Sequence, residues 1–477
     1  MSRIQPTTGV GAPGLDGARV VAVVGFLVFV ELTSGIIQGM MPSLLPELGS
    51  LLNVGAGDLN WVNAAQLLAA AISVPLFGRL GDMYGHRRLL RIAVLCLVAG
   101  SVLVAWSPSF GLLLLGRVLQ GPLAALLPLE IGLVRDHLDA AGARGAIALL
   151  VGALTFGASA GTVISGLLRQ VIPSAHGVLW IPAVATVLCA GVVLFLVPES
   201  TTRARSKVDW AGAGLLSVGL ATLLLGISQG PKWGWTDTYT LTLLVVAVVT
   251  LVSWVVVELR VPEPIVDIRL TVRRTLLPVY AASFLLGTAL FGAQTASVVF
   301  LSSPPDKLGY GFGYDALGIA WLMLPSGAMA FLASLVASRL FKLIGGRGAL
   351  ALSGTLMVIG YVFLIVAHDE PWQFVVVNAV VGSGIGLALS AMPVLIVESS
   401  PHERTAIATG IYNTAKTVGG SVAGAVFAAI LTAITFKGTK IPTIDAYTTV
   451  WSCCAGVAAL IAVAAAVAAR PRTAENR

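Results

Sequence analysis

Three charged side chains lie inside long apolar stretches of the sequence, where ionisable groups are rare and usually functional. Glu31 falls about eleven residues into the first stretch, and Arg117 and Glu130 fall in the fourth. A carboxylate at a bilayer midplane costs about 2.5–3.5 kcal/mol, so Glu31 should face a wet cavity or bind a proton. We predict that Glu31, Arg117 and Glu130 serve proton coupling. The alternatives are a packing carboxyl at Glu31, a structural hydrogen bond at Arg117 and a snorkelled surface carboxylate at Glu130.

Further polar side chains in the apolar stretches predict the wall of a substrate cavity. Ser34 and Gln38 follow Glu31 at helical spacing, and Asn413 shares a helix face with Lys416. A single amide in such a helix more often bonds to a neighbouring helix, and this alternative applies most to Gln294 and Asn378. The predicted cavity residues are Glu31, Ser34, Gln38, Gln120, Gln294, Asn378, Asn413 and Lys416.

A short glycine-rich and basic segment at 78–88 lies between the second and third apolar stretches. Its glycines tolerate positive φ and let two helix ends approach closely. Asp82 lies where the following helix starts, so it can interact with free backbone N–H groups. The alternative is a basic loop that only sets membrane topology. We predict a conformational switch loop with six principal residues, Gly78, Gly81, Asp82, Gly85, Arg87 and Arg88.

The composition indicates the type of secondary structure in which these residues lie. The chain has 477 residues, 57% of them hydrophobic and 11% charged, whereas soluble proteins carry about 25% charged residues. A bilayer core needs about 20 apolar residues per helical span, and a lone strand cannot satisfy its backbone in lipid. The sequence therefore predicts an all-α integral membrane protein with fourteen transmembrane helices. Their limits are 20–43, 59–77, 90–107, 110–134, 144–168, 178–198, 209–228, 239–258, 276–302, 315–337, 348–367, 372–396, 405–433 and 447–469.

The distribution of Lys and Arg predicts the orientation of the spans. Most of the 29 basic residues fall on the side of the two tails. The opposite side holds only Arg169, Lys232, Lys307, Lys437 and Lys440. Because basic loops stay inside, both termini are expected in the cytoplasm of a multi-pass cell-membrane protein. The excess of Arg over Lys suggests a bacterial source.

Two polar stretches, 199–208 and 259–274, divide the spans into six, two and six. An internal echo supports the division: Arg–Leu opens both Arg79–Arg87 and Arg339–Arg347, and in each segment a Gly precedes the closing Arg at the same offset. Such repeats are typical of transporters that rock two halves around a central site. The predicted parts are a tail at 1–19, an N-terminal six-helix bundle at 20–198, linkers and two inserted helices at 199–274, a C-terminal six-helix bundle at 275–469 and a tail at 470–477.

These motifs resemble the major facilitator superfamily. The loop Gly78-x-Leu-Gly-Asp-x-x-Gly-His-Arg-Arg88 resembles its signature loop, and Arg117-Val-Leu-Gln-Gly121 resembles a fourth-helix motif associated with proton coupling. Pro198-Glu-Ser, Val208-Asp-Trp and the Trp233-Gly-Trp235 turn resemble the fourteen-helix drug/proton antiporters. The resemblance implies the major facilitator fold, with the first, fourth, seventh and tenth core helices lining the cavity. It makes Glu31 the counterpart of an Asp common in the first helix.

The resemblance also implies that Lys416 occupies a position where relatives often carry Arg. One stretch departs from the family pattern. The fifth helix of antiporters usually carries Gly-Pro and a Gly-Gly pair, whereas this chain has Gly157-Ala-Ser-Ala-Gly161-Thr. These small residues predict tight packing against a neighbouring helix.

The sequence predicts a secondary active transporter that exports lipophilic or cationic small molecules in exchange for protons. A transporter of a defined metabolite, including uptake, is the first alternative, and a membrane receptor or membrane-embedded enzyme is a remote one. We find no catalytic constellation, no metal-ligand spacing and no phosphate-cradling motif in the sequence. The expected energy source is therefore the proton gradient, without a cofactor. The expected partners are a small-molecule substrate, protons and the lipid bilayer, with no nucleic acid, and the protein is expected to be a monomer.

Overall fold

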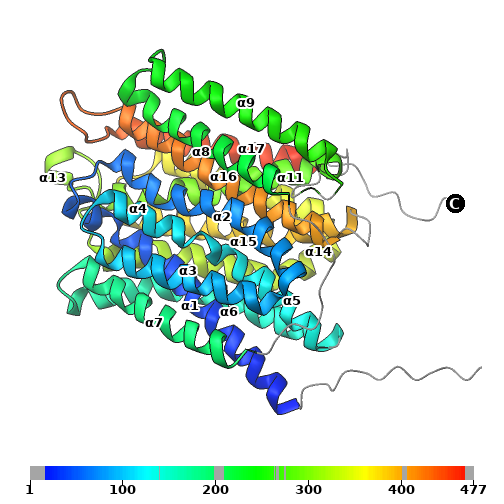
Figure 1. Ribbon diagram of the computed structural model, residues 1–477. Coiled ribbons are helices and arrows are strands. Elements are labelled where there is room, and N and C mark those ends of the chain that lie inside the picture. The colour runs from blue at the N-terminus through cyan, green and yellow to red at the C-terminus, as the bar shows by residue number, and fades with distance from the viewer. Residues whose placement is uncertain are drawn as a thin grey trace, which may run out of the picture.

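The computed structural model describes residues 17–138, 140–197, 209–262, 264, 268–272, 276–399 and 405–467. This part of the chain is helical apart from short loops and one isolated bridge between Thr435 and Pro442. The helices run roughly parallel or antiparallel to one another in a single bundle (Figure 1). Residues 1–16 of the predicted amino-terminal tail, the whole predicted tail 470–477 and the whole predicted linker 199–208 lie outside the described residues.

The helices fall into three groups along the chain. The amino-terminal half contains α1 (Gly17–Leu51), α2 (Ala56–Tyr84), α3 (His86–Trp106), α4 (Phe110–Leu119), the 3₁₀ helix η1 (Gly121–Ala125), α5 (Leu126–His137), α6 (Ala140–Val171) and α7 (Ala175–Phe195). The inserted pair is α8 (Trp210–Trp233) and α9 (Thr238–Arg260). The carboxy-terminal half contains α10 (Ile268–Thr271), α11 (Leu277–Gly287), the π-helix η2 (Thr288–Gly292), α12 (Ala293–Ser302), α13 (Pro305–Leu308), α14 (Ala316–Val366), α15 (Pro371–Ser399), α16 (Thr405–Ala433) and α17 (Ile444–Val467).

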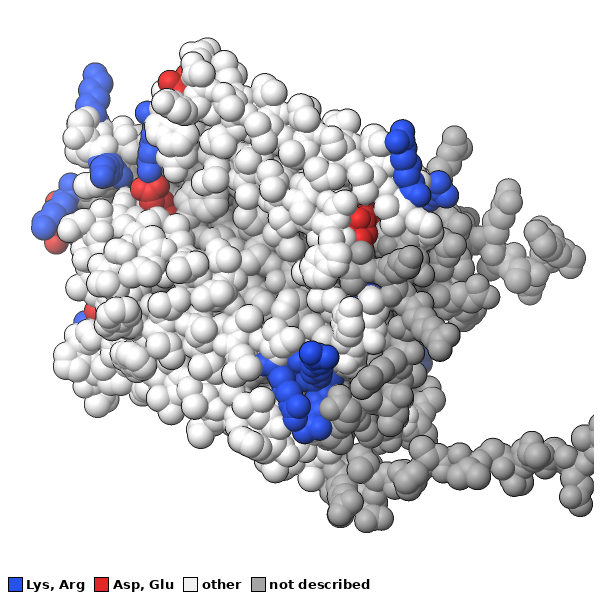
Figure 2. Space-filling view, in the orientation of Figure 1, with Lys and Arg blue, Asp and Glu red and all other residues white. Residues whose placement is uncertain are grey.

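Fourteen segments of these helices are long and apolar enough to cross a membrane, which confirms the predicted fold class. Several helices extend beyond their predicted limits. The first continues to Leu51, past Pro42 and Pro46, because apolarity decides where a span meets lipid but not where a helix ends. The tenth and eleventh spans both lie within α14, which changes direction at Gly345 with φ 72°. Figure 2 shows the described charges towards the two ends of the visible face, with an uncharged band between them.

The inserted pair lies at the edge of the bundle (Figure 1). Only Thr240, Ala247 and Glu258 are buried on α9 within the described residues, and α9 forms one margin of the molecule in Figure 1. Helix α8 packs inward against α2 and α16, where Leu224 joins a small apolar cluster with Ala64 and Ala425. The pair therefore covers the outside of the junction between the two halves.

Two of the membrane helices are irregular near their middle. The fourth span ends as α4 at Leu119 and continues as η1, because Pro122 has no N–H to donate and its ring obstructs a regular helix. The ninth span contains the single π turn Thr288–Gly292, a feature found frequently at functional sites. Polar side chains lie next to each irregular turn: Gln120 precedes η1, and the Tyr361 hydroxyl donates to the Ala289 carbonyl within η2 at 3.2 Å.

Helices α1 and α6 approach each other closely through small residues. A Cβ at Gly39 would meet the carbonyl of Ala158, and a Cβ at Gly161 would meet the carbonyl of Ile36. The Thr162 hydroxyl donates to the Gly39 carbonyl at 3.0 Å. The small residues of the fifth span therefore achieve the predicted tight packing without a proline.

The two halves meet at the end of the bundle that we call the loop end, where α1 stops at Leu51 and α2 begins at Ala56. The chain enters α1 and leaves α17 at the opposite end, which we call the terminus end (Figure 1). Ser421 of α16 donates to the Ala64 carbonyl of α2 at 3.4 Å near the middle of both helices, and closer to the loop end Gly57 of α2 packs on Thr432 of α16. On the other side of the junction, Gly166 of α6 packs on Leu317 of α14. The halves are therefore in close contact at the loop end in this conformation.

Candidate functional site

The carboxyl groups of Glu31 and Glu130 meet inside the amino-terminal half. Glu31 comes from α1 and Glu130 from α5, and their exposed fractions are 1% and 0%. The two groups interact electrostatically, and their oxygens accept no hydrogen bond from the part of the chain that the structure describes. Two predicted proton-coupling residues, far apart in sequence, thus form one buried acidic pair.

The surroundings of the acidic pair are almost entirely apolar. Leu27 and Val30 of α1, Leu129 and Leu133 of α5 and Val193 of α7 belong to the same buried cluster. The Cys189 thiol of α7 lies close enough to interact with Glu130. None of these described side chains donates a hydrogen bond to the pair or carries a positive charge, so the pair is suited to holding a proton.

Arg117 is the third predicted proton-coupling residue, and its partners lie elsewhere. Its guanidinium donates to the Val62 carbonyl at 2.9 Å, to Gln120 Oε1 at 2.8 Å and to Asn63 Oδ1 at 3.2 Å. Arg117 is 2% exposed, and within the described residues it contacts neither carboxyl of the acidic pair. A backbone carbonyl and two side-chain amide oxygens accept these hydrogen bonds. This geometry corresponds to the alternative in which Arg117 makes structural hydrogen bonds.

The hydrogen bonds around Arg117 extend into both halves. Gln120 donates to Ser101 of α3 at 3.1 Å. On the other side, Asn63 of α2 donates to Thr295 of α12 at 3.2 Å, which crosses the junction between the halves. The sequence analysis did not select Thr295, because a threonine in an apolar span gives no signal of its own until its partner is known.

The predicted cavity residues divide into buried and half-buried groups. Ser34 and Gln120 are 1% and 2% exposed, so in this conformation they lie within the packed helices. Asn378 donates to the Phe374 carbonyl of its own helix at 2.9 Å. Half-buried side chains are found at five of the predicted positions, Gln38, Gln294, Asn378, Asn413 and Lys416. These five retain accessible surface and are the best candidates for substrate contact.

The predicted switch loop is a single-residue junction between two helices. Gly85 ends α2 and begins α3 with φ 101°, a conformation that favours glycine. Arg87 and Arg91 donate to the Leu194 carbonyl at the end of α7, where the helix dipole favours cations. Gly81 lies against Leu129, the neighbour of Glu130. Gly78 has open space around it and Arg88 is exposed, while the Asp82 side chain lies outside the described residues.

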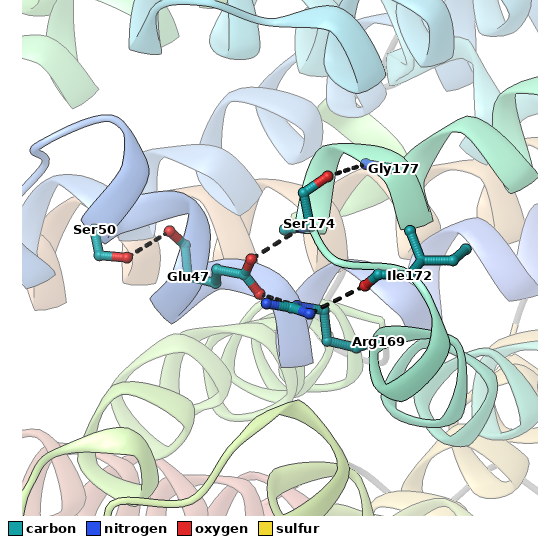
Figure 3. Close-up of polar contacts among 7 residues, drawn as sticks. Glu47, Ser50, Arg169, Ile172, Ser174 and Gly177 are labelled. Carbon is teal, nitrogen blue, oxygen red and sulfur yellow. Dashed lines mark hydrogen bonds and ion pairs between the residues drawn. The ribbon is translucent and has the colours of Figure 1, made fainter.

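The loop end contains a polar cluster that the sequence analysis did not predict. Arg169 of α6 pairs with Glu47 of α1 at 2.5 Å and donates to the Ile172 carbonyl at 3.0 Å (Figure 3). Glu47 also accepts from the backbone N–H of Ala175 at 3.0 Å. Arg169 interacts with Asp315 as well, the residue that caps α14 in the other half. This cluster places one cation between carboxylates of the two halves.

A cavity of about 490 Å³ opens at the loop end of the carboxy-terminal half. Aromatic side chains line it, including Phe300, Tyr310 and His368, together with Asp369 and Asp445. None of the predicted site residues lines this cavity. Within the described ranges no three His, Cys, Asp or Glu side chains gather as a metal site would require.

Comparison with known proteins gives consistent matches along the chain. A family model described as Major Facilitator Superfamily matches residues 27–424 and 284–477. The tetracenomycin C resistance and export protein of Streptomyces glaucescens is 28% identical over 450 residues, covering 90% of this chain and 78% of that protein. The multidrug resistance protein Stp of Mycobacterium tuberculosis is 25% identical over 392 residues, covering 82% and 72%.

Solved structures resemble the fold as a whole. The crystal structure of an auto-inhibited POT-family peptide transporter superposes with a TM-score of 0.68 at 13% sequence identity. That match covers 96% of this chain and 98% of the solved one. At such low identity the likeness concerns the arrangement of the helices alone.

Proposed function

The chain belongs to the Major Facilitator Superfamily, and we propose that it exports lipophilic small molecules in exchange for protons. Drugs or secondary metabolites are the proposed class of cargo, because two relatives are named for antibiotic export or multidrug resistance. In the proposed arrangement the protein spans the cell membrane with both termini in the cytoplasm. The observation that carries proton exchange is the buried acidic pair of Glu31 and Glu130.

The acidic pair has the chemistry that a proton carrier needs. Two carboxylates in contact and away from water repel each other, so the pair retains a proton while it is enclosed. When a conformational change admits water, the charge is solvated and the proton leaves. Leu129 connects the pair to Gly81 at the α2–α3 junction, so a movement of these helices alters the enclosure of the pair.

Alternating access supplies the required change in enclosure. In the present conformation the halves touch near the loop end through Gly57 and Thr432 and through Gly166 and Leu317. Opening this end requires separation of those contacts, while the terminus end closes in turn. We propose that the protein can open one end and close the other with either a proton or a substrate bound. Competition between the two links uphill export to the proton gradient.

The test uses everted membrane vesicles that are acidified internally and loaded with a pH-sensitive dye. Adding a transported compound should release protons from wild-type vesicles. Glu31→Gln keeps the shape of the side chain but cannot titrate, so proton release should be lost while substrate binding persists. Glu258→Gln is the matched control, because Glu258 is also a buried membrane carboxyl but lies on the inserted helix α9, where Trp254 donates to it at 2.9 Å.

The control should release protons at the wild-type rate. Uphill transport by Glu31→Gln with an unchanged pH dependence would refute a coupling role for Glu31. Proton release that accompanies uptake of a single metabolite, rather than export of several compounds, would favour the alternative of a metabolite transporter.

A further inference from the structure

Lys416 is a cation inside the carboxy-terminal half, and the proposed proton exchange does not use it. It lies on α16, and its ammonium group stands 5.2 Å from the centre of the Tyr412 ring. The Lys416 side chain lies among packed helices and is half-buried, so part of its surface remains accessible. An aromatic face is a weak partner for an ammonium group compared with a carboxylate. Lys416 therefore retains capacity for a stronger interaction.

The packing of α16 shows where this side chain lies. Gly420 contacts Leu67 of α2, from the amino-terminal half, and Phe291 of η2, from the carboxy-terminal half. Lys416 comes one helical turn before Gly420 and therefore shares its face of α16. Asn413 precedes Lys416 by three residues on the same face and is also half-buried. The face that carries Asn413 and Lys416 thus adjoins the contact between the halves.

No carboxylate balances the charge of Lys416 within the described residues. The two ion pairs seen there, Arg169 with Glu47 and Lys232 with Asp58, both lie near the loop end. The carboxyl groups of the acidic pair are 0–1% exposed and lie between helices of the amino-terminal half. Arg117 is satisfied by its three acceptors. Of the two cations that lie well inside the described spans, Arg117 and Lys416, only Lys416 keeps accessible surface.

We propose that Lys416 is the residue that selects the substrate class, and that the class is lipophilic organic anions. This inference rests on the proposed export function and refines it. An acidic group on the substrate would neutralise Lys416, while the Asn413 amide on the same face can donate to the same group. A lipophilic cation would instead be placed against an unneutralised ammonium. The cationic cargo that the sequence analysis included is therefore disfavoured.

The experiment compares two probes of the same shape and opposite charge, tetraphenylborate and tetraphenylphosphonium. Binding to the purified full-length protein is measured by titration without a proton gradient. We expect the wild type to bind the borate at least about tenfold more tightly than the phosphonium, since the Lys416 ammonium group attracts the anion and repels the cation. Lys416→Gln should reduce this ratio to near one. Lys416→Arg should preserve it, because the charge remains.

The controls separate specificity from folding and from proton coupling. Equal thermal unfolding temperatures for the three proteins would show that Lys416→Gln leaves the fold intact. If the Gln variant unfolds, the preference of the wild type for the borate decides the inference. Equal binding of both probes by the wild type, or an unchanged ratio in Lys416→Gln, would overturn it. Since no gradient is present, failure of proton-coupled export would appear in the vesicle assay and not in this ratio.

Discussion

The carboxyl groups of Glu31 on α1 and Glu130 on α5 face each other in an apolar shell, although 98 residues separate them in the chain. Neither receives a hydrogen bond from the described residues. Burial away from water and mutual repulsion both disfavour the charged form of each carboxyl group. The protonation of one residue should therefore depend on the protonation of the other.

Removing the second member of the pair tests this dependence. Glu130→Gln should lower the initial rate of proton-driven export by about tenfold or more, comparable to the effect of losing a general acid or base. In the wild type, the export rate should fall as the pH rises on the side that supplies protons. The variant should show a flatter profile, because one of the two titrating groups is gone.

The double variant Glu31→Gln/Glu130→Gln should export no more slowly than either single variant, since the pair acts as a unit. The measurement is the rate of export at a series of pH values in vesicles. Strictly additive losses would show that the two residues act independently.

Gly39 tests the close packing of α1 on α6. Gly39→Val should destabilise the protein by about 1–3 kcal/mol, because the side chain would meet the Ala158 carbonyl. Gly152→Ala is the control on the same helix pair, since a Cβ at Gly152 meets nothing within 4 Å. Its stability should be unchanged or slightly raised, because Ala is the better helix former. Thermal unfolding in detergent distinguishes the two, and equal unfolding temperatures would contradict the packing account.

Asp315 tests the contact between the halves at the loop end. Asp315→Asn keeps the capping oxygen that accepts from the Gly318 N–H at 2.9 Å, but it removes the charge that attracts Arg169. An exposed ion pair contributes up to about 1 kcal/mol, so the open population should rise by up to about fivefold. Spin labels at Ser50 and Asp306, one in each half and both exposed, would report longer distances. An identical distance distribution would show that the attraction does not hold this end closed.

Asp82 tests the switch loop. Asp82→Asn should slow transport several-fold while leaving membrane insertion intact, because the basic residues that set topology remain. Its effect should come from loss of the negative charge close to the α2–α3 junction at Gly85. Transport rate and the amount of protein in the membrane are measured together. Wild-type transport at normal expression would count against a switching role for this residue.

The sequence by itself determined the number and type of the membrane elements. A span is recognised from about 20 consecutive apolar residues, and that property is local in the chain. The sequence also marked Glu31, Arg117, Glu130 and Lys416 as unusual, since a charge inside a span is costly whatever its neighbours are. Gly85 could be predicted to join two helices closely, because glycine tolerates a positive φ. Its observed φ of 101° confirms that reason.

Only the tertiary structure decided which of these residues meet. The rotation and tilt of packed helices depend on contacts such as Gly39 on Ala158, which hydropathy does not encode. Those contacts brought Glu130 to Glu31 and left Arg117 with Asn63 and Val62. They also placed Arg169 between Glu47 and Asp315, a cluster without any sequence signal because its members lie near span ends where charges are common. Partner choice is a property of three-dimensional packing, whereas the cost of burying a charge is a property of the residue.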